Sequence, residues 1–499
     1  MARRERCVVR KANFWKASEM LVVWAAMAIA AQAQSFDSFY NFEWPSGANP
    51  YYMTLVQGID GSLYGTTQDG GSGTGFGKCT SGLNVDCGTV FKIDRTGTFV
   101  SLYSFCLQQG CPDGYYPYSG LAVGPGGDLY GTTFWGGANG MGTIFKMTSA
   151  RTLITLHSFN GGDGDTPTSG VIFGRDGNLY GMTNGGGTQN AGTVYRITPA
   201  GTLTTLYNFC ALTDCKDGES PWGGLVQGSD GNFYGTTVVG GDPACFEGAS
   251  CGTVFKITPG GRLTTLHKFV LTDGEYPYAS LVQGVDGNFY GTTSLGGTSG
   301  SGTVFQMTPD GVVTTIHSFC SQANCPDGRE PQAPLIQATD GKFYGTATQG
   351  GEAGCIQVGC GTLFQITKDG TFTVLHIFDF GDGYIPDGGM LQATDGRFYG
   401  TTQGGGSALS GTIFRLSTDL PPFVTFVRNS GYIGQTGPIL GQGFTGTTSV
   451  SFNGMSAQFT VKSDTYLLAT VPPGATTGYV TVTTPSGTLT SNKPFVVIP

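Results

Sequence analysis

Carboxylates and aromatic rings recur together in this sequence at a fixed spacing. The motif Asp-Gly-x-x-Pro occurs six times, and an aromatic residue directly follows several of its prolines. The six carboxylates belong to Asp113, Asp163, Asp217, Asp273, Asp327 and Asp382. A seventh copy, Ser46-Gly47-Ala48-Asn49-Pro50, lacks the carboxylate. Aromatic rings can stack on the apolar face of a sugar while neighbouring carboxylates hydrogen-bond its hydroxyls.

The aromatic residues that follow these prolines complete a candidate ligand-binding set. They are Tyr51, Tyr118, Trp222 and Tyr278. The alternative is that the rings pack between structural repeats and that each Asp caps its own turn. Structural calcium held by the carboxylates is a further alternative, but the ligand spacing of an EF-hand loop is absent. The sequence indicates no cofactor and no resident metal.

The four histidines occupy one equivalent position, two residues before a recurring Phe. They are His157, His267, His317 and His376, and other copies have Tyr40, Tyr103 and Tyr207 there. Exchange with Tyr predicts a structural role, since a metal site needs several ligands brought together. No nucleophile elbow, phosphate loop or zinc-protease helix is present, so no catalytic residue is singled out.

Twelve of the 13 cysteines form close couples in the sequence. The couples are Cys79/Cys87, Cys106/Cys111, Cys210/Cys215, Cys245/Cys251, Cys320/Cys325 and Cys355/Cys360. An even number of locally paired cysteines predicts six disulfides formed in an oxidising compartment. Metal binding is the alternative, although no couple has Cys-x-x-Cys spacing and no His lies close by. A pairing of Cys87 with Cys106 is also open.

Residues 1–33 have the pattern of a signal peptide. Six basic residues accompany a short apolar run from Leu21 to Ala31, and Ala31-Gln32-Ala33 offers a cleavage site. An uncleaved anchor is the alternative, but the run is shorter than the roughly 20 residues of a membrane span. We therefore expect cleavage near Ala33, a mature chain without a transmembrane segment, and a secreted, cell-surface or periplasmic location.

The mature chain is predicted to be acidic. The whole chain has 25 Lys+Arg and 34 Asp+Glu, and removing six basic and two acidic residues of the leader leaves 19 against 32, a net charge of −13. Such a charge repels phosphate backbones and anionic membrane surfaces. Nucleic acid is therefore excluded as an expected partner.

The elements that position these residues repeat about every 54 residues. The octet Asp286 to Thr293, Asp-Gly-Asn-Phe-Tyr-Gly-Thr-Thr, has versions centred on Tyr64, Tyr130, Tyr180, Tyr234, Tyr290, Tyr344 and Tyr399. In the copy around the octet, the β-rich segments 281–284, 288–293, 302–307 and 312–319 predict four strands. Asp-Gly supplies the positive φ angles of a tight hairpin between the first two.

Repeated four-stranded antiparallel units predict a β-propeller, with an open solenoid as the alternative. The seventh repeat lacks a fourth strand, and residues 35–42 match the fourth-strand pattern. We therefore predict an all-β fold: a seven-bladed propeller over residues 35–418, closed by an N-terminal strand that leaves no open edge. The candidate aromatic residues would then lie at the mouth of the central channel.

Residues 421–499 form a second predicted domain. This region has no cysteine, loses the Tyr-Gly-Thr-Thr period, and contains short alternating strands such as 449–452 and 479–483. Its length and pattern predict an immunoglobulin-like β-sandwich.

Two family resemblances accompany these patterns. The recurring blocks Gly-x-Asp-Gly-Asn-Phe-Tyr-Gly-Thr-Thr, Gly-Thr-Val-Phe-Lys-Ile-Thr and Leu-Thr-Thr-Leu-His-Ser-Phe resemble the GloVer tandem repeat of exported bacterial "choice-of-anchor" proteins. The tail resembles an IPT/TIG domain in residues 441–444, 450–454, 471–478 and 484–487. The first resemblance implies a secreted or surface repeat protein. The second implies a spacer or adhesion module without catalytic residues.

Near-identity of the repeats favours a non-enzymatic exported scaffold for binding, adhesion or display, because an enzyme site requires one or two repeats to depart in polar residues. The expected partner is an extracellular polysaccharide or a surface protein, and the sequence indicates no oligomeric state. The alternative is a polysaccharide lyase or glycosidase at the channel mouth, with a carboxylate pair drawn from two repeats. A third interpretation is a self-associating structural protein of a surface layer.

Overall fold

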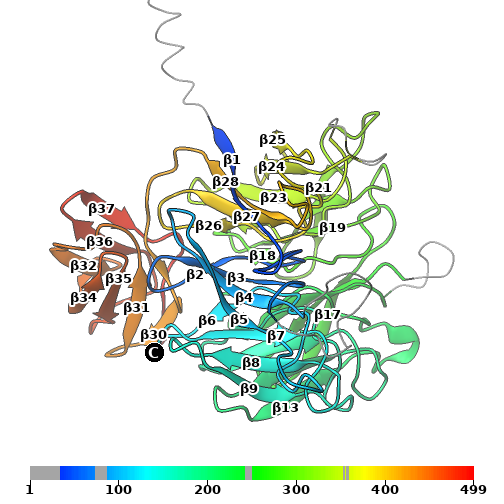
Figure 1. The fold of residues 1–499 in the computed structure, drawn as a ribbon, viewed down its shortest axis with the longest axis horizontal. Coiled ribbons are helices and arrows are strands. Elements are labelled where there is room, and N and C mark those ends of the chain that lie inside the picture. The colour runs from blue at the N-terminus through cyan, green and yellow to red at the C-terminus, as the bar shows by residue number, and fades with distance from the viewer. Residues whose placement is uncertain (1–33, 73–86, 242–249, 352–354, 356–358, 499) are drawn as a thin grey trace, which may run out of the picture.

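The protein is described from a computed structural model that covers residues 34–72, 87–241, 250–351, 355 and 359–498. Within these ranges it consists of β-strands and connecting loops, apart from one 3₁₀ turn, η2 (Thr213–Cys215) (Figure 1). The prediction of an all-β chain is confirmed. The predicted signal peptide, Cys79 and Cys245 lie outside the described residues.

Seven four-stranded antiparallel sheets follow one another along residues 35–417. Sheets 1 to 3 contain β2 (Val56–Gln57), β3 (Leu63–Thr67), β4 (Thr89–Ile93), β5 (Phe99–Ser104); β6 (Ala122–Val123), β7 (Leu129–Thr133), β8 (Thr143–Met147), β9 (Leu153–Ser158); β10 (Ile172–Phe173), β11 (Leu179–Thr183), β12 (Thr193–Ile197) and β13 (Leu203–Asn208). Sheets 4 and 5 contain β14 (Val226–Gln227), β15 (Phe233–Thr237), β16 (Thr253–Ile257), β17 (Leu263–Lys268); β18 (Val282–Gln283), β19 (Phe289–Thr293), β20 (Thr303–Met307) and β21 (Val313–Ser318).

Sheets 6 and 7 complete this series. They contain β22 (Ile336–Gln337), β23 (Phe343–Ala347), β24 (Thr362–Ile366), β25 (Phe372–Ile377); β26 (Leu391–Gln392), β27 (Phe398–Thr402), β28 (Thr412–Ser417) and β1 (Ser35–Asn41). The N-terminal strand β1 thus pairs with β28 and takes the fourth position of sheet 7. A bidentate ion pair between Arg415 and Asp37, at 3.0 Å, joins the two strands.

The octet builds both the hairpin and the contact between sheets. In sheet 5, Asp286 accepts a hydrogen bond from the Asn288 backbone amide at 3.1 Å and from the Tyr290 hydroxyl at 2.7 Å. Gly287 has a φ of 86°, which glycine adopts without steric cost. The Tyr290 ring packs on Phe343 of the next sheet, with ring centroids 4.0 Å apart. The octet is therefore scaffold.

A hydrogen bond links each sheet to the next, and sheet 7 to sheet 1. The first Thr of Gly-Thr-Thr donates to a backbone carbonyl that precedes the next sheet's first strand, as in Thr292 to Ala333 (3.3 Å) and Thr346 to Pro386 (2.7 Å). Sheet 3 has Met182 at this position and uses Thr168 to Trp222 instead, at 3.0 Å. The link from sheet 7 to sheet 1 is Thr401 to the Met53 carbonyl, at 3.4 Å. The remaining links are Thr66 to Ser119, Thr132 to Ser169 and Thr236 to Ala279.

Residues 421–498 form a separate module with its own core. Its strands are β29 (Thr425–Phe426), β31 (Thr436–Leu440), β35 (Tyr466–Thr470), β34 (Phe459–Ser463); β33 (Met455–Ser456), β32 (Ser449–Phe452), β36 (Val480–Thr484), β37 (Gly487–Thr490); β30 (Ser430–Tyr432) and β38 (Val496–Ile498). The two four-stranded sheets share a core that includes Val450, Leu467 and Val482, while β30 and β38 pair in parallel.

The module packs against the face that carries the Asp-Gly hairpins (Figure 1). Arg428 donates to the carbonyls of Gly174 (3.3 Å) and Arg175 (2.9 Å), in the hairpin of sheet 3. Gln442 donates to the Thr394 hydroxyl at 2.7 Å, in the hairpin of sheet 7. Because strands alternate in direction, the longer loops and the cysteines lie on the opposite face.

Candidate functional site

The residue before each motif proline turns the chain sharply. Its φ is positive in all seven sheets although none of the seven is glycine: Asn49 (50°), Tyr116 (55°), Thr166 (50°), Ser220 (52°), Tyr276 (56°), Glu330 (55°) and Ile385 (53°). Such conformations are costly for residues with a side chain and concentrate at functional sites. In each repeat, this turn therefore lies two positions before the residue that follows the proline.

The residues that follow the prolines differ from sheet to sheet. They are Tyr51, Tyr118, Thr168, Trp222, Tyr278, Gln332 and Asp387, in sheets 1 to 7. The flanking Asp-Gly and Gly-Thr-Thr segments are nearly invariant. Variation at equivalent loop positions of a repetitive scaffold is typical of a binding surface.

The four predicted aromatic residues come together, joined by Tyr52. The Tyr51 ring lies 4.4 Å from that of Tyr52 and 5.2 Å from that of Tyr118, between centroids. Trp222 lies 5.8 Å from Tyr52 and 5.6 Å from Tyr278. All four pairs meet edge to face, and each ring keeps part of its surface exposed.

A cavity of about 240 Å³ lies beside part of this cluster, and we call it the mouth cavity; the predicted residues Tyr51 and Tyr118 do not line it. Its wall includes Tyr52, Trp222 and Tyr278 together with the polar residues Thr168, Gln332 and Asp387. The Tyr52 hydroxyl donates to the Gln332 side-chain oxygen, which fixes one edge of the wall. The cavity thus combines aromatic faces with a small number of polar groups, the usual composition of a ligand site.

Asp387 is the buried acid of this cavity, with 1% of its surface exposed. One carboxyl oxygen accepts a hydrogen bond from the Tyr52 backbone amide at 3.4 Å. The other oxygen has no hydrogen-bond partner among the described residues. Burial raises the pKa of this carboxyl to about 8, because the charged form loses its hydration. Asp387 is therefore largely protonated at neutral pH.

Two further buried polar atoms of the mouth cavity lack partners within the described residues: Trp222 Nε1 and Ser169 Oγ. Burying an unpaired polar group costs roughly 1–3 kcal/mol, so native structures seldom keep several in one place. An indole donor, a hydroxyl and a carboxyl oxygen around one cavity fit a ligand rich in hydroxyl groups.

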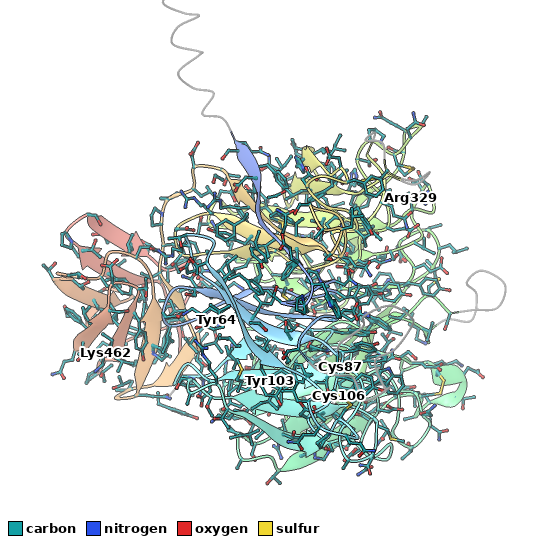
Figure 2. The ribbon with its side chains drawn as sticks, viewed as in Figure 1. Tyr64, Cys87, Tyr103, Cys106, Arg329 and Lys462 are labelled. Atoms are coloured by element: carbon teal, nitrogen blue, oxygen red, sulfur yellow. A yellow bond between two sulfur atoms is a disulfide. The ribbon has the colours of Figure 1, made fainter. Side chains whose placement is uncertain are left out.

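The six motif carboxylates lie elsewhere and close their own turns. Asp217 accepts from the Ala211 and Leu212 amides at 2.9 and 3.0 Å and from the Tyr207 hydroxyl at 2.8 Å. Tyr103 pairs likewise with Asp113 at 2.8 Å; Figure 2 labels Tyr103. The histidines pair with the other four: His157 with Asp163, His267 with Asp273, His317 with Asp327 and His376 with Asp382. None of the six Asp residues lines the mouth cavity.

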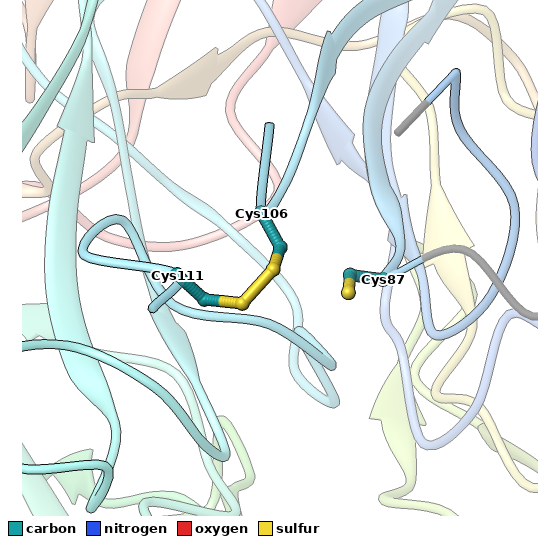
Figure 3. A group of neighbouring side chains, drawn as sticks. All are labelled: Cys87, Cys106 and Cys111. Atoms are coloured by element: carbon teal, nitrogen blue, oxygen red, sulfur yellow. A yellow bond between two sulfur atoms is a disulfide. The ribbon is translucent and has the colours of Figure 1, made fainter. Parts of the chain in front are cut away.

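Four predicted disulfides are present: Cys106–Cys111, Cys210–Cys215, Cys320–Cys325 and Cys355–Cys360. Figure 3 shows the first of these beside Cys87. The three sulfur atoms lie within 4.8 Å of one another, a spacing that would suit a metal. The open question of a Cys87–Cys106 pair is answered, since Cys106 bonds Cys111. Cys87 is itself disulfide-bonded, so this cluster offers no free thiolate for a metal.

Sequence reasoning missed Tyr52, Thr168, Gln332 and Asp387. The last three occupy the slot after the proline that already supplied Tyr51, Tyr118, Trp222 and Tyr278. Reading that slot through all seven repeats, instead of selecting its aromatic members, would have found them.

In the part of the chain that the structure describes, no helix is long and apolar enough to cross a membrane.

The family model of the Gloeobacter/Verrucomicrobia repeat matches residues 246–461. This supports the resemblance to the GloVer repeat over that range, which is less than half of the chain. No curated protein matches the sequence.

Similar solved structures are distant. A Bacteroides uniformis protein, provisionally described as a 6-phosphogluconolactonase, is 14% identical over 67% of this chain and 86% of its own, with a TM-score of 0.42. A luciferin-regenerating enzyme is 12% identical over 61% and 92%, with a TM-score of 0.37. A gluconolactonase of Xanthomonas campestris is 13% identical over 58% and 82%, with a TM-score of 0.34. At such scores the likeness carries no argument about the chemistry of this chain.

Proposed function

We propose that the protein is an exported, non-enzymatic carbohydrate-binding scaffold whose ligand occupies the mouth cavity. The ligand would be a segment of extracellular polysaccharide, with a sugar ring placed against Trp222 and Tyr278. Its hydroxyl groups would hydrogen-bond Asp387, Gln332 and Thr168. The C-terminal module would act as an IPT/TIG-type spacer.

The main support for this function comes from the position that follows the motif proline, which we call the slot. Seven copies of one scaffold present seven side chains there, three of them tyrosine and the others Thr, Trp, Gln and Asp. The unpartnered atoms of Trp222 and Asp387 belong to this set. This slot varies between repeats while the flanking Asp-Gly and Gly-Thr-Thr segments are nearly invariant, so it can serve binding without disturbing the scaffold.

A seven-bladed β-propeller closed by β1 is the architecture that we propose around this site. It is supported by the seven four-stranded sheets and by the hydrogen bonds that link each to the next, including Thr401 to Met53. Export is supported by the basic and apolar pattern of residues 1–33 and by the local disulfides.

A glycan array probed with the mature protein tests the proposal. We expect binding to a subset of neutral or acidic polysaccharides, weakened about 30-fold in Trp222→Ala, because a central aromatic anchor contributes roughly 2 kcal/mol or more. Trp135→Ala is the matched control, since Trp135 does not line the mouth cavity. Absence of binding to every glycan, or equal weakening by both variants, would contradict the proposal.

The second candidate function is that of a carbohydrate-active enzyme, and the raised pKa of Asp387 favours it. A carboxyl with a pKa of about 8 can act as a general acid near neutral pH. Glycosidases pair such an acid with a second carboxylate. Among the described residues that line the mouth cavity, Asp387 is the only carboxyl. Release of reducing or unsaturated sugar ends from a bound polysaccharide, lost in Asp387→Asn, would establish the enzyme.

A further inference from the structure

A second cavity, of about 440 Å³, lies at the module end of the central space, and we call it the module chamber. Its walls come from the first strands of the sheets, such as β2 and β26, and from residues 425–430 and 492–493 of the module. It shares the wall residues Val56, Leu121, Val171 and Ile172 with the mouth cavity. The two cavities therefore adjoin along one path through the repeat region.

The charge of the module chamber is of one sign. Lys493, Arg428 and Arg175 line it, and no carboxylate stands among its described wall residues. This contrasts with the acidic chain as a whole, whose formal net charge is −9. A concentration of cations inside an acidic protein is costly unless an anion balances it.

The Lys493 ammonium has no hydrogen bond or ion pair to any described residue. Its side chain is exposed and belongs to the wall of the chamber. Desolvation by the surrounding protein lowers the pKa of Lys493. An unpaired ammonium in the wall of a cavity is a group to which a ligand would provide the missing partner.

The two guanidinium groups are held in place but keep donors to spare. Arg175 donates to the carbonyls of Gly228 and Ser229 at 3.0 and 3.2 Å, and Asp230 lies near enough to interact with its charge. Arg428 uses one terminal nitrogen for the carbonyls of the sheet 3 hairpin. A guanidinium carries five N–H donors, so each retains some that no described group accepts.

The wall of the module chamber also contains a hydrogen-bond acceptor without a partner. The buried side-chain oxygen of Asn492 has no hydrogen-bond partner among the described residues. A ligand that satisfies the chamber must therefore bring both an anionic group for the cations and an O–H donor for Asn492. A bare halide has no such donor. A cavity of several hundred Å³ is of the size that holds a monosaccharide.

We propose that the module chamber binds a small hydroxylated oxyanion, a sugar acid or a sugar phosphate, through Lys493, Arg428 and Arg175. The oxyanion lies against Lys493 and the free guanidinium donors, and a hydroxyl donates to Asn492. These three cationic residues do not line the mouth cavity. A ligand that bridges module residues and repeat residues also stabilises the contact between them, by linkage.

Calorimetric titration of the mature protein tests this, with galacturonate, glucose 6-phosphate, inorganic phosphate and neutral galactose as probes. We expect one or both sugar anions to bind, and galactose not to bind at this site. Lys493→Gln should weaken anion binding by at least about tenfold, since a charge-assisted hydrogen bond is lost. Lys493→Arg should retain most of it.

Lys462→Gln is the matched control, because it makes the same change of charge at an exposed lysine of β34 (Figure 2). The melting temperature of each variant checks its fold, and Lys493→Gln should not lower it, because the ammonium that it removes has no partner among the described residues. Failure of every anion to bind, or equal weakening by Lys493→Gln and Lys462→Gln, would overturn the proposal. Lys493→Gln should leave polysaccharide binding at the mouth unchanged, whereas Trp222→Ala affects only that binding, so the two proposals fail separately.

Discussion

Replacing Asp387 by Asn should stabilise the protein at neutral pH. The native state holds this carboxyl buried with a pKa of about 8, whereas the ordinary pKa of an Asp side chain is 3.8. Between these values the unfolded chain has lost its proton while the native protein keeps it. The unfolded state thus binds fewer protons, so the free energy of unfolding falls as pH rises through this window. Asn has nearly the same shape, accepts from the Tyr52 amide, and does not ionise.

The magnitude follows from the two pKa values. Each pKa unit corresponds to about 1.4 kcal/mol, so the carboxyl costs the native state on the order of 6 kcal/mol above pH 8 and about 4 kcal/mol at pH 7. Near pH 4 the cost is close to zero. Asp387→Asn should therefore raise the unfolding free energy by up to about 4 kcal/mol at pH 7 and change it little at pH 4.

Urea unfolding of both proteins from pH 4 to pH 8 measures this difference. The variant's gain should grow with pH across the window, and the exposed Asp369→Asn should show no such growth. A gain that is equal at pH 4 and pH 7, or a loss at both, would refute the argument that Asp387 is a buried protonated acid. Native sites that sacrifice stability in this way are commonly functional.

Three further predictions concern the scaffold. Asp217→Ala should lower the unfolding free energy by roughly 2–4 kcal/mol, because one buried carboxylate satisfies two backbone amides and the Tyr207 hydroxyl, and Asp217→Asn should cost less; denaturant titration decides this. Ile385→Asn should stabilise by about 1 kcal/mol in the same assay, since Asn tolerates a φ of 53° better than a β-branched residue, and a loss would show that Ile385 packing outweighs the backbone. Peptide mapping without reduction should recover Cys106–Cys111, Cys210–Cys215, Cys320–Cys325 and Cys355–Cys360 together with the predicted Cys79–Cys87 and Cys245–Cys251, and free thiols would contradict an oxidising compartment.

The strands could be predicted from the sequence almost to the residue. Segments 281–284, 288–293, 302–307 and 312–319 correspond to β18 (Val282–Gln283), β19 (Phe289–Thr293), β20 (Thr303–Met307) and β21 (Val313–Ser318). Asp-Gly turns and alternating β-branched and aromatic residues determine local structure, so the strands can be recognised within a single repeat. Seven copies of the pattern then reinforce each assignment.

Only part of the candidate site could be predicted from the sequence. Trp222 and Tyr278 stand out as aromatic residues beside a proline, and the structure brings them together with Tyr51 and Tyr118. Asp387 does not stand out, because an acid after a proline usually lies in a solvated turn. Its pKa is raised only because the connection that precedes β26 buries the carboxyl. The motif carboxylates are more conspicuous in the sequence than Asp387 because they repeat. They repeat because each one closes a turn of its own repeat.

The module chamber had no signal in the sequence. Arg175, Arg428 and Lys493 are separated by up to 318 positions and occupy unrelated local patterns. They meet because the C-terminal module docks on the hairpin face, a contact made by a few side chains such as Gln442. Tertiary placement of this kind leaves no periodic trace in a single sequence.

A crystal structure of the mature protein with an oligosaccharide selected on the glycan array would show whether the mouth cavity holds the ligand. We predict a sugar ring in the mouth cavity, stacked against Trp222 or Tyr278, with hydroxyl groups bonded to Asp387 and to the indole nitrogen of Trp222. A ligand bound on the outer faces of the sheets or on the C-terminal module, with the mouth cavity empty, would contradict carbohydrate binding at the mouth cavity.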